Sequence, residues 1–243
     1  MINELLSQLD APFTGEVLFD HVHDIVFFIK DCDCRYLVVN QTLVERCGLK
    51  FKSEILGKTA SEVLSPSLGC GFTLQDHDVL ETGQPLISQL ELHLDAKRES
   101  TWCLTTKLPL KGNQGTIVGL VGISQDLRIP DVRTEEYSHV AAAIQHGENN
   151  LANPPTAPEL AKVAGMSKYQ LDRRMLHLFG LTTIQWMTKT RIDYAQRLLV
   201  TTNQSAAEIA HQTGYTDQSA FTRQFRHSTG LSPMQYRDAK SVK

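Results

Sequence analysis

The sequence has no run of about 18 consecutive apolar residues, the shortest length that crosses a bilayer as a helix. Its first twenty residues carry Glu4 and Asp10 but no lysine or arginine, and they lack the apolar core of a secretory signal. These absences predict that a membrane is not a partner. We expect the protein in the cytoplasm.

The sequence also lacks a cysteine framework. Its five cysteines, an odd number, all lie in the first half, and no two have the Cys-x-x-Cys spacing of zinc ribbons. Cys32 and Cys34 stand beside Asp31 and Asp33, whose negative charges raise the pKa of a thiol and make it less reactive. We therefore expect no metal site and no cofactor.

The net charge of −3 over 243 residues conceals two halves of opposite sign. Residues 1–133 hold 12 lysines and arginines against 18 aspartates and glutamates, a balance of −6, and residues 134–243 hold 12 against 9, a balance of +3. The length suffices for two domains of about 110 residues, each with its own core. This asymmetry favours a sensory domain joined to a domain that binds a polyanion.

The basic half contains a repeated unit, which reads as a short helix, a turn and a second helix. At an offset of 49, residues 159–161 and Gly165 match residues 208–210 and Gly214. Beyond the turn the offset becomes 50, which aligns these pairs: Leu171 with Phe221, Met175 with Phe225, Gly180 with Gly230, and Gln185 with Gln235. The extra residue is predicted in the turn of the second copy, where a change of length is best tolerated.

The second helix of each copy is predicted to have an apolar face and a polar face. Leu171 and Met175 lie on the apolar arc of the first, and Phe221 and Phe225 on that of the second. The opposite arcs hold amides, hydroxyls and guanidinium groups, which read base edges in the major groove. We expect base contacts from Tyr169, Gln170, Arg173, Gln218, Ser219, Thr222 and Arg223, and phosphate contacts from Arg174 and Arg226.

Between the copies, Thr183 to Thr201 has no glycine or proline and predicts one continuous helix. At 1.5 Å per residue it spans roughly 28 Å, near the ~34 Å repeat of B-DNA. Such a helix would hold the two polar faces about one turn of DNA apart. We therefore expect double-stranded DNA as the partner, contacted in two adjacent segments of the major groove.

A further set of residues in this half forms a signature: Arg191, Ala195, Leu198-Leu199, Glu208-Ile209-Ala210, Gly214-Tyr215, Phe221, Arg223, Phe225, Gly230-Leu231-Ser232-Pro233 and Tyr236-Arg237. It resembles the signature of AraC-family transcription regulators over about a hundred residues. Tyr169 and Met175 depart from the family pattern, which usually has tryptophan or histidine at the first position and an aromatic residue at the second. The resemblance implies a sequence-specific regulator of transcription, mostly an activator, with RNA polymerase as a further partner. It implies neither catalytic residues nor an enzyme.

The acidic half predicts strands and short helices. Residues 24–29 and 36–40 read as strands, and residues 41–48, 53–56, 60–64 and 72–82 as helices interrupted at Gly57, Pro66, Gly69, Gly71 and Gly83. Three longer strands follow. In the middle one, Trp102, Leu104 and Leu108 alternate with Thr105 and Lys107, which places the leucines on the apolar side.

This order resembles a PAS domain, on residues 26–31, 35–40, 78–83 and 119–126. The resemblance implies a five-stranded antiparallel sheet with helices on one face, a small-molecule effector and a homodimer. The pocket ligand is unknown. The Asn-Cys-Arg-Phe-type stretch of flavin-binding members is absent, and His77, the one helical candidate for a haem ligand, is expected on the surface. An apolar pocket for a metabolite and no ligand at all both remain open.

The predicted fold class is therefore α+β with two domains. Residues 129–134 carry Pro130 and read as a linker, and residues 135–146 read as a helix that stops at Gly147. Residues 1–130 form a PAS-like sensor or dimerisation domain, and residues 131–243 form an all-α, AraC-like double helix-turn-helix domain.

Two alternatives belong to other classes of protein. One is a regulator in which a cysteine accepts an alkyl group beside a zinc ion, although Cys32, Cys34, Cys47 and Cys70 lack the spacing of such proteins. The other is a sensory adaptor that has lost DNA binding. Arg173 and Arg223 stand at matching positions of the two copies, which argues against the adaptor.

Overall fold

The computed structural model describes residues 7–241, except residues 11, 65, 95–99 and 128–129. Apart from Leu90–Leu92 in the third strand, the chain divides into two compact units between Asp126 and Leu127. Within the described residues, no helix combines the length and the apolar composition that crossing a membrane requires.

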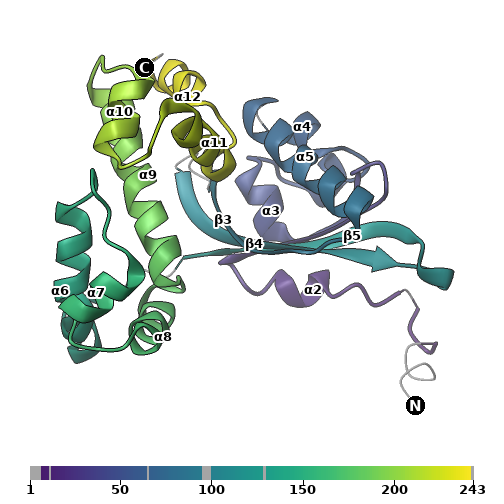
Figure 1. The fold of residues 1–243 in the computed structure, drawn as a ribbon. Helices are drawn as coiled ribbons and strands as arrows, with labels where there is room; N and C mark the ends of the chain where they lie inside the picture. Colours follow the sequence, from purple (N-terminus) through teal and green to yellow (C-terminus); the bar gives the residue numbers. More distant parts are fainter. Residues whose placement is uncertain (1–6, 11, 65, 95–99, 128–129, 242–243) are drawn as a thin grey trace. The chain divides into compact units, whose positions relative to one another are not determined.

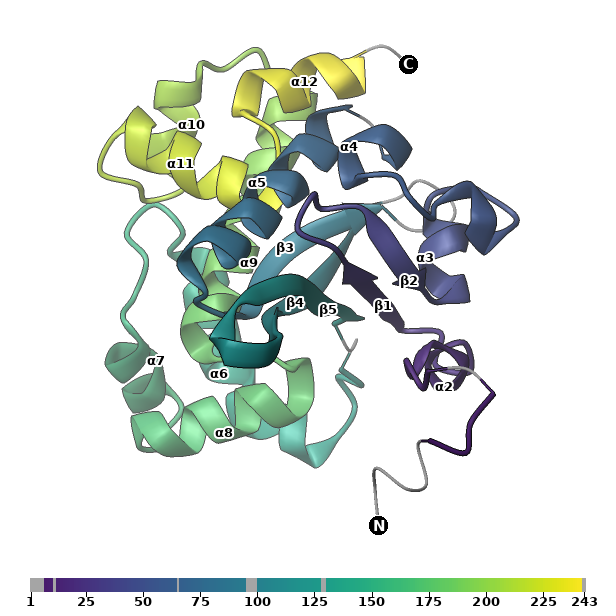
Figure 2. The ribbon, with the colours of Figure 1, turned by 90° about the vertical axis from the view of Figure 1, so that its right-hand side faces the viewer.

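The N-terminal unit is built on a five-stranded sheet. Its strands are β1 (Ile25–Lys30), β2 (Tyr36–Val39), β3 (Leu86–Leu94), β4 (Ser100–Lys111) and β5 (Ile117–Asp126). They lie in the order β2-β1-β5-β4-β3, which Figure 2 shows across the sheet. β1 runs antiparallel to both β2 and β5, and β5 runs antiparallel to β4. This is the antiparallel sheet that the sequence predicted.

Helices cover one face of this sheet. The helical elements of the unit are α2 (Glu16–Phe19), α3 (Gln41–Arg46), the 3-10 turn η1 (Lys52–Glu54), α4 (Ala60–Val63), α5 (Pro66–Thr82) and the 3-10 turn η2 (Asn113–Gly115). Figure 1 shows α3, α4 and α5 on one side of the sheet and α2 on the other. The core between sheet and helices consists of Val26, Phe28, Tyr36, Val39, Leu43, Val44, Ile55, Ala60, Val79 and Leu120.

Helix α5 differs from its prediction. It begins at Pro66 instead of Phe72, and it continues through Gly69 and Gly71, which were expected to interrupt it. A Cβ atom on Gly69 would lie 2.5 Å from the carbonyl oxygen of Ala60 and 2.5 Å from Cα of Ser61. Glycine at this position therefore lets α5 cross α4 at close range, and it does not end the helix.

Strand β4 alternates as predicted, but its buried side is partly polar. Thr105 and Lys107 are buried, whereas Leu108 is 43% exposed. The hydroxyl of Thr105 shares a 2.8 Å hydrogen bond with the hydroxyl of Ser124 in β5, and Lys107 pairs with Asp76 in α5. The assignment of the leucines to the apolar side was wrong for Leu108, because polar partners from β5 and α5 stabilise the other side.

The C-terminal unit is helical throughout its described part. Its helices are α6 (Glu135–Asn149), α7 (Ala157–Val163), α8 (Lys168–Phe179), α9 (Thr183–Thr201), α10 (Ala206–Gln212), α11 (Gln218–Thr229) and α12 (Pro233–Ser241). The bounds of α9 are those predicted. α9 contacts α8, α10 and α12, and Figure 1 shows it running from α8 to the α10–α12 group.

Helix α6 continues through Gly147, where the sequence predicted its end. A Cβ atom on Gly147 would lie 2.7 Å from Cε of Met187 and 2.8 Å from Cζ3 of Trp186, both in α9. Glycine here allows close packing of α6 against α9, as Gly69 allows close packing of α5 against α4. The helix ends two residues later, at Asn149.

Candidate nucleic-acid interface

The two copies of the repeated unit begin with the same short helix. α7 and α10 are each seven residues long, and a capping box starts each one, formed by Thr156 with Glu159 and by Ser205 with Glu208. In a capping box the side chain of the N-cap residue accepts a hydrogen bond from the backbone N–H three residues later. The side chain of that later residue accepts one from the backbone N–H of the N-cap residue. The repeat seen in the sequence is thus also a repeat of hydrogen bonding.

The turn after each short helix is also the same. Gly165 and Gly214 adopt left-handed backbone angles, with φ of +67° and +70°. The next N–H donates back to the short helix, from Met166 to the carbonyl of Ala161 at 3.0 Å and from Tyr215 to that of Ala210 at 2.9 Å. Both turns therefore need a residue that tolerates positive φ, which glycine does without strain.

α8 and α11, the two candidate recognition helices, match in length and in termination. Each is twelve residues long and ends at a left-handed glycine, Gly180 or Gly230. Their N-caps are Ser167 and Asp217. One residue separates Gly165 from Ser167, and two separate Gly214 from Asp217. The inserted residue therefore lies in the second turn, where the sequence predicted it.

Each recognition helix buries the apolar arc that was predicted for it. Leu171, Met175 and Leu178 of α8 are buried, as are Phe221, Phe225 and Ser228 of α11. In the second unit the rings of Tyr215, Phe221, Phe225 and Tyr236 form a chain with successive centroid distances of 5.5 Å. This packing fixes the rotation of α11 about its axis, and so decides which of its side chains face outward.

The predicted DNA-contacting residues lie mostly on the outer faces. Tyr169 is 75% exposed. The other side chains that the structure exposes are Gln170, Arg173, Gln218, Ser219, Arg223 and Arg226. Thr222 and Arg174 are half-buried. The structure thus places an outward polar surface on α8 and another on α11.

Two of these side chains have partners within the protein. The side-chain oxygen of Gln170 accepts a 2.8 Å hydrogen bond from the N–H of Ser167, as part of the capping box of α8. A guanidinium nitrogen of Arg174 lies 2.9 Å from Nδ1 of His139 in α6. The oxygen of Gln170 thus has one partner within the protein, and its NH₂ group is the donor that a base edge would accept.

Two arginines that were not predicted as site residues position the second unit. Nε and Nη2 of Arg191 in α9 donate to the carbonyls of Thr213 and Gly214, at 2.5 and 2.8 Å. Its guanidinium also lies 3.8 Å from the centroid of the Tyr215 ring. Arg237 donates to the carbonyls of Leu199 and Gln204, at 3.0 and 2.6 Å. Both stand in the sequence signature, but only the structure shows that they donate to backbone carbonyls.

The α6–α7 loop makes a second contact with the turn of the second unit. A Cβ atom on Gly214 would lie 2.4 Å from Cδ of Pro154 and 2.6 Å from the carbonyl oxygen of Leu151. An open groove of about 660 Å³ lies beside this contact, lined in part by His146, Asn153 and His211. Within the C-terminal domain, α9 and this loop therefore set the relative position of the two helix-turn-helix copies.

The N-cap of α11 carries a charge that favours its helix. The side chain of Asp217 accepts a 2.7 Å hydrogen bond from the N–H of Ala220. Hydrogen bonds from the backbone of Ala220 and Ser219, with the nearby charge of Arg223, hold the pKa of Asp217 below its usual value. A carboxylate at a helix N-terminus is stabilised by the N–H groups there.

The cysteines of the N-terminal unit do not gather. Cys32 and Cys70 are exposed, Cys47 is half-buried and Cys34 is buried. In the described part of the chain, no three histidine, cysteine, aspartate or glutamate side chains lie close enough to hold a metal ion. Burial raises the pKa of Cys34 and of Cys47 to about 11, so both thiols are protonated and weakly nucleophilic at neutral pH. These findings do not favour the alkyl-acceptor alternative.

Comparisons with known proteins agree with both halves of this architecture. A family model described as a PAS fold matches residues 19–129, and one described as a helix-turn-helix domain matches residues 160–239. The transcriptional activator NphR of Rhodococcus sp is 36% identical over 106 residues, which cover 43% of this chain and 30% of NphR. The probable transcriptional regulator LumQ of Photobacterium leiognathi is 23% identical over 214 residues, which cover 78% of this chain and 86% of LumQ.

Among solved structures, the chain is similar to the DNA-binding domain of AdpA in complex with a target DNA, with 34% identity and a TM-score of 0.40. That match covers 41% of this chain and 90% of the AdpA chain. Fold and matches together define a two-domain chain, in which a PAS fold precedes a helix-turn-helix domain. The matched relatives are named as a transcriptional activator and a probable transcriptional regulator, and each match to a family model covers less than half of this chain.

Proposed function

We propose that the protein is a sequence-specific DNA-binding regulator of transcription that acts as an activator. One observation carries this proposal: α8 and α11 have the same length, each follows a turn with a left-handed glycine and ends at another, and both have outward polar faces. A pair of such helices joined by α9 can enter two adjacent segments of the major groove on one side of a duplex. NphR, which matches part of the chain, is named as an activator.

The outward side chains divide into two groups by chemistry. Tyr169, Gln170, Arg173, Gln218, Ser219, Thr222 and Arg223 contact bases, through amides, hydroxyls and guanidinium groups that match base edges. Arg174 and Arg226 contact phosphates, together with backbone N–H groups at the helix starts. Phosphate contacts set the register of the protein on DNA, and base contacts give specificity.

Residues 1–130 act as the sensor or dimerisation domain in this proposal, and residues 131–243 bind the DNA. A small-molecule effector would regulate the protein only through a difference in its affinity for two states of the chain. A second copy of the chain and RNA polymerase are the expected protein partners. The protein has no catalytic role in this account.

Selection of binding sites from random double-stranded DNA, with the full chain as bait, tests the proposal. The expected result is one consensus made of two conserved blocks, with centres about 10 base pairs apart. The matched control is the Arg173→Ala, Arg223→Ala double variant, which removes one guanidinium from each helix and should enrich no consensus. Failure of the parent chain to enrich any sequence would contradict the proposed function.

A further inference from the structure

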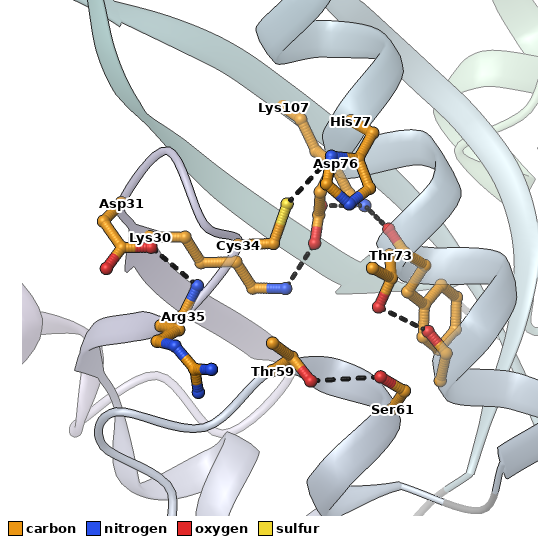
Figure 3. Close-up of polar contacts among 12 residues, drawn as sticks. Lys30, Asp31, Cys34, Arg35, Thr59, Ser61, Thr73, Asp76, His77 and Lys107 are labelled. Atoms are coloured by element: carbon orange, nitrogen blue, oxygen red, sulfur yellow. Dashed lines mark hydrogen bonds and ion pairs between the residues drawn. The ribbon is translucent and has the colours of Figure 1, made fainter.

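The N-terminal unit encloses three charged side chains from three elements. Lys30 lies at the end of β1, Asp76 lies in α5 and Lys107 lies in β4. Their side chains are 1%, 0% and 3% exposed. The ammonium groups of Lys30 and Lys107 bind different oxygens of the Asp76 carboxylate, the second at 2.6 Å (Figure 3).

Aromatic rings and one carbonyl complete the surroundings of the two ammonium groups. Nζ of Lys30 lies 4.1 Å from the ring centroid of Tyr36 and 5.3 Å from that of Phe28. Nζ of Lys107 donates to the carbonyl of Phe72 at 3.2 Å and lies 5.9 Å from the centroid of the Phe72 ring. The two ammonium groups thus lie buried among apolar ring surfaces.

The charges of this cluster do not balance. Two ammonium groups face one carboxylate, which leaves a net charge of +1 in the interior. Asp76 is the sole carboxylate that pairs with either lysine in the part of the chain that the structure describes. An unbalanced buried charge is strongly unfavourable, so buried ions are normally paired one to one.

The thiol of Cys34 and the hydroxyl of Tyr36, which lie near the cluster, do not supply the missing negative charge. Cys34 is buried, and its Sγ lies 3.8 Å from Nδ1 of His77 (Figure 3). Burial, with the charge of Asp76, raises the pKa of the Cys34 thiol to about 11 and that of the Tyr36 hydroxyl well above its usual value. Both groups are therefore neutral at physiological pH. His77 is exposed, as the sequence predicted, and adds no negative charge.

The second lysine adds a charge that a link between sheet and helix does not need. A single pair of Lys30 and Asp76 would already join β1 to α5 with balanced charge. A methionine in place of Lys107 would not leave the carbonyl of Phe72 without a donor, because this carbonyl lies within α5, where the N–H four residues later donates to it. Lys107 adds a contact between β4 and α5, and with it one positive charge more than the carboxylate of Asp76 balances.

We propose that Lys30 and Lys107 bind the carboxylate of a small organic monoanion with an apolar or aromatic body, and that this anion is the effector of the sensor domain. The inference rests on the proposed regulatory function. The single negative charge of the ligand equals the excess charge of the cluster, and the rings of Phe28, Tyr36 and Phe72 suit its carbon part. Because the cluster joins β1, β4 and α5, its occupation affects three elements of the domain together.

Thermal unfolding of the full chain tests the proposal, with sodium benzoate and sodium acetate as probes and sodium chloride at equal ionic strength as reference. A Trp186→Phe background leaves Trp102 as the one tryptophan, so that fluorescence reports the N-terminal domain. At about ten times its Kd, a bound probe should raise the unfolding temperature by roughly 5 °C. Absence of any shift beyond chloride with both carboxylates overturns the proposal.

Two variants on β4 separate a binding role from a scaffold role. Lys107→Met should abolish the response to carboxylates and, because it balances the charge, should unfold at the same or a higher temperature without a probe. Lys111→Met removes an exposed lysine from the same strand and should respond as the parent does. If Lys107→Met lowers the unfolding temperature of the probe-free chain, or still responds to benzoate, the second ammonium group belongs to the scaffold and the proposal is wrong.

The two proposals fail in different ways. Loss of the carboxylate response in a chain that still selects a DNA consensus overturns only the effector site. A carboxylate response in a chain that selects no DNA sequence supports the site and contradicts the function as a DNA-binding regulator.

Discussion

Arg173 and Arg223 have exposed side chains although the opposite sides of their helices are fully buried. Helical periodicity was enough to predict this, because at 100° per residue the positions of Leu171 and Phe221 determine where these arginines point. The contacts that side chains make with backbone were not predictable. The capping role of Gln170 and the backbone contacts of Arg191 depend on the turn geometry, which periodicity does not contain.

Arg223→Ala should weaken binding to the selected DNA site by about 1–3 kcal/mol and relax the preference at one base position. The reason is that a guanidinium group that binds a guanine edge distinguishes that base from the others. Arg226→Ala is the matched control on the same helix. As a phosphate contact it should weaken binding to all sequences alike and reduce the slope of log K against log salt by about 1. Fluorescence anisotropy with the consensus site and its single-base variants measures both effects, and equal behaviour of the two variants would refute the assignment.

The buried cluster of Lys30, Asp76 and Lys107 was also beyond sequence analysis. Its members are separated by 46 and 31 positions in the chain, and alternation placed Lys107 opposite the apolar residues of its strand. Only the packing of α5 on the sheet brings the three together. A charged residue in a strand can therefore point into the core of the domain when a partner of opposite charge lies there.

At the scale of elements, the sequence predicted the five strands, the helices of the two repeated units, and α9 with its bounds, but neither α2 nor α12. Its errors came from glycine. Gly69 and Gly147 were interpreted as helix breakers, yet each lies inside a helix at a close crossing with another. In contrast, Gly165, Gly180, Gly214 and Gly230 adopt positive φ and do mark turns and helix ends. The difference lies in tertiary packing, which a single sequence does not reveal.

Gly165→Ala and Gly214→Ala form a matched pair that isolates the contact of the α6–α7 loop. Both glycines have positive φ, so alanine costs about 1 kcal/mol at each. No atom lies within 4 Å of a Cβ on Gly165, whereas Pro154 and Leu151 block one on Gly214. Gly214→Ala should therefore destabilise the C-terminal domain by about 1–3 kcal/mol more. Urea unfolding followed by Trp186 in a Trp102→Phe background measures the difference, and equal losses would contradict the contact.

The capping boxes predict a dependence of stability on pH. Hydrogen bonds from the backbone N–H and hydroxyl of Thr156 and of Ser205 hold the pKa of Glu159 and of Glu208 below the usual 4.5. A carboxyl group with a lowered pKa in the folded state contributes stability above its usual pKa, and this contribution is lost as the pH falls through the lowered value. Urea unfolding midpoints for the C-terminal domain should therefore decrease below about pH 4.5.

Glutamine at both positions is the control for this effect. Gln170 and Gln185 already occupy the same place in the capping boxes of α8 and α9, so the substitution keeps the hydrogen bonds and removes the titration. The Glu159→Gln, Glu208→Gln variant should lose less stability than the parent between pH 6 and pH 4. An identical pH profile for parent and variant would show that the capping carboxylates do not control acid stability.

For the whole molecule, the charge balance and the two resemblances predicted an acidic sensor before a basic DNA-binding domain. The PAS and helix-turn-helix matches and the fold of each unit confirm the two domain types. The charge of the sensor interior was not predictable, because the net balance of −6 for residues 1–133 hides a local excess of +1 around Asp76. The proposed effector site rests on this local balance and not on the total charge.

The central claim is that α8 and α11 of one chain read two separate blocks of a single DNA site. Site selection from random DNA with Arg173→Ala and with Arg223→Ala, each beside the parent chain, tests this claim most directly. We predict that each variant loses information in one block only, that the two affected blocks differ, and that their centres lie about 10 base pairs apart. Loss in the same block for both variants, or an unchanged consensus for either one, would contradict the account.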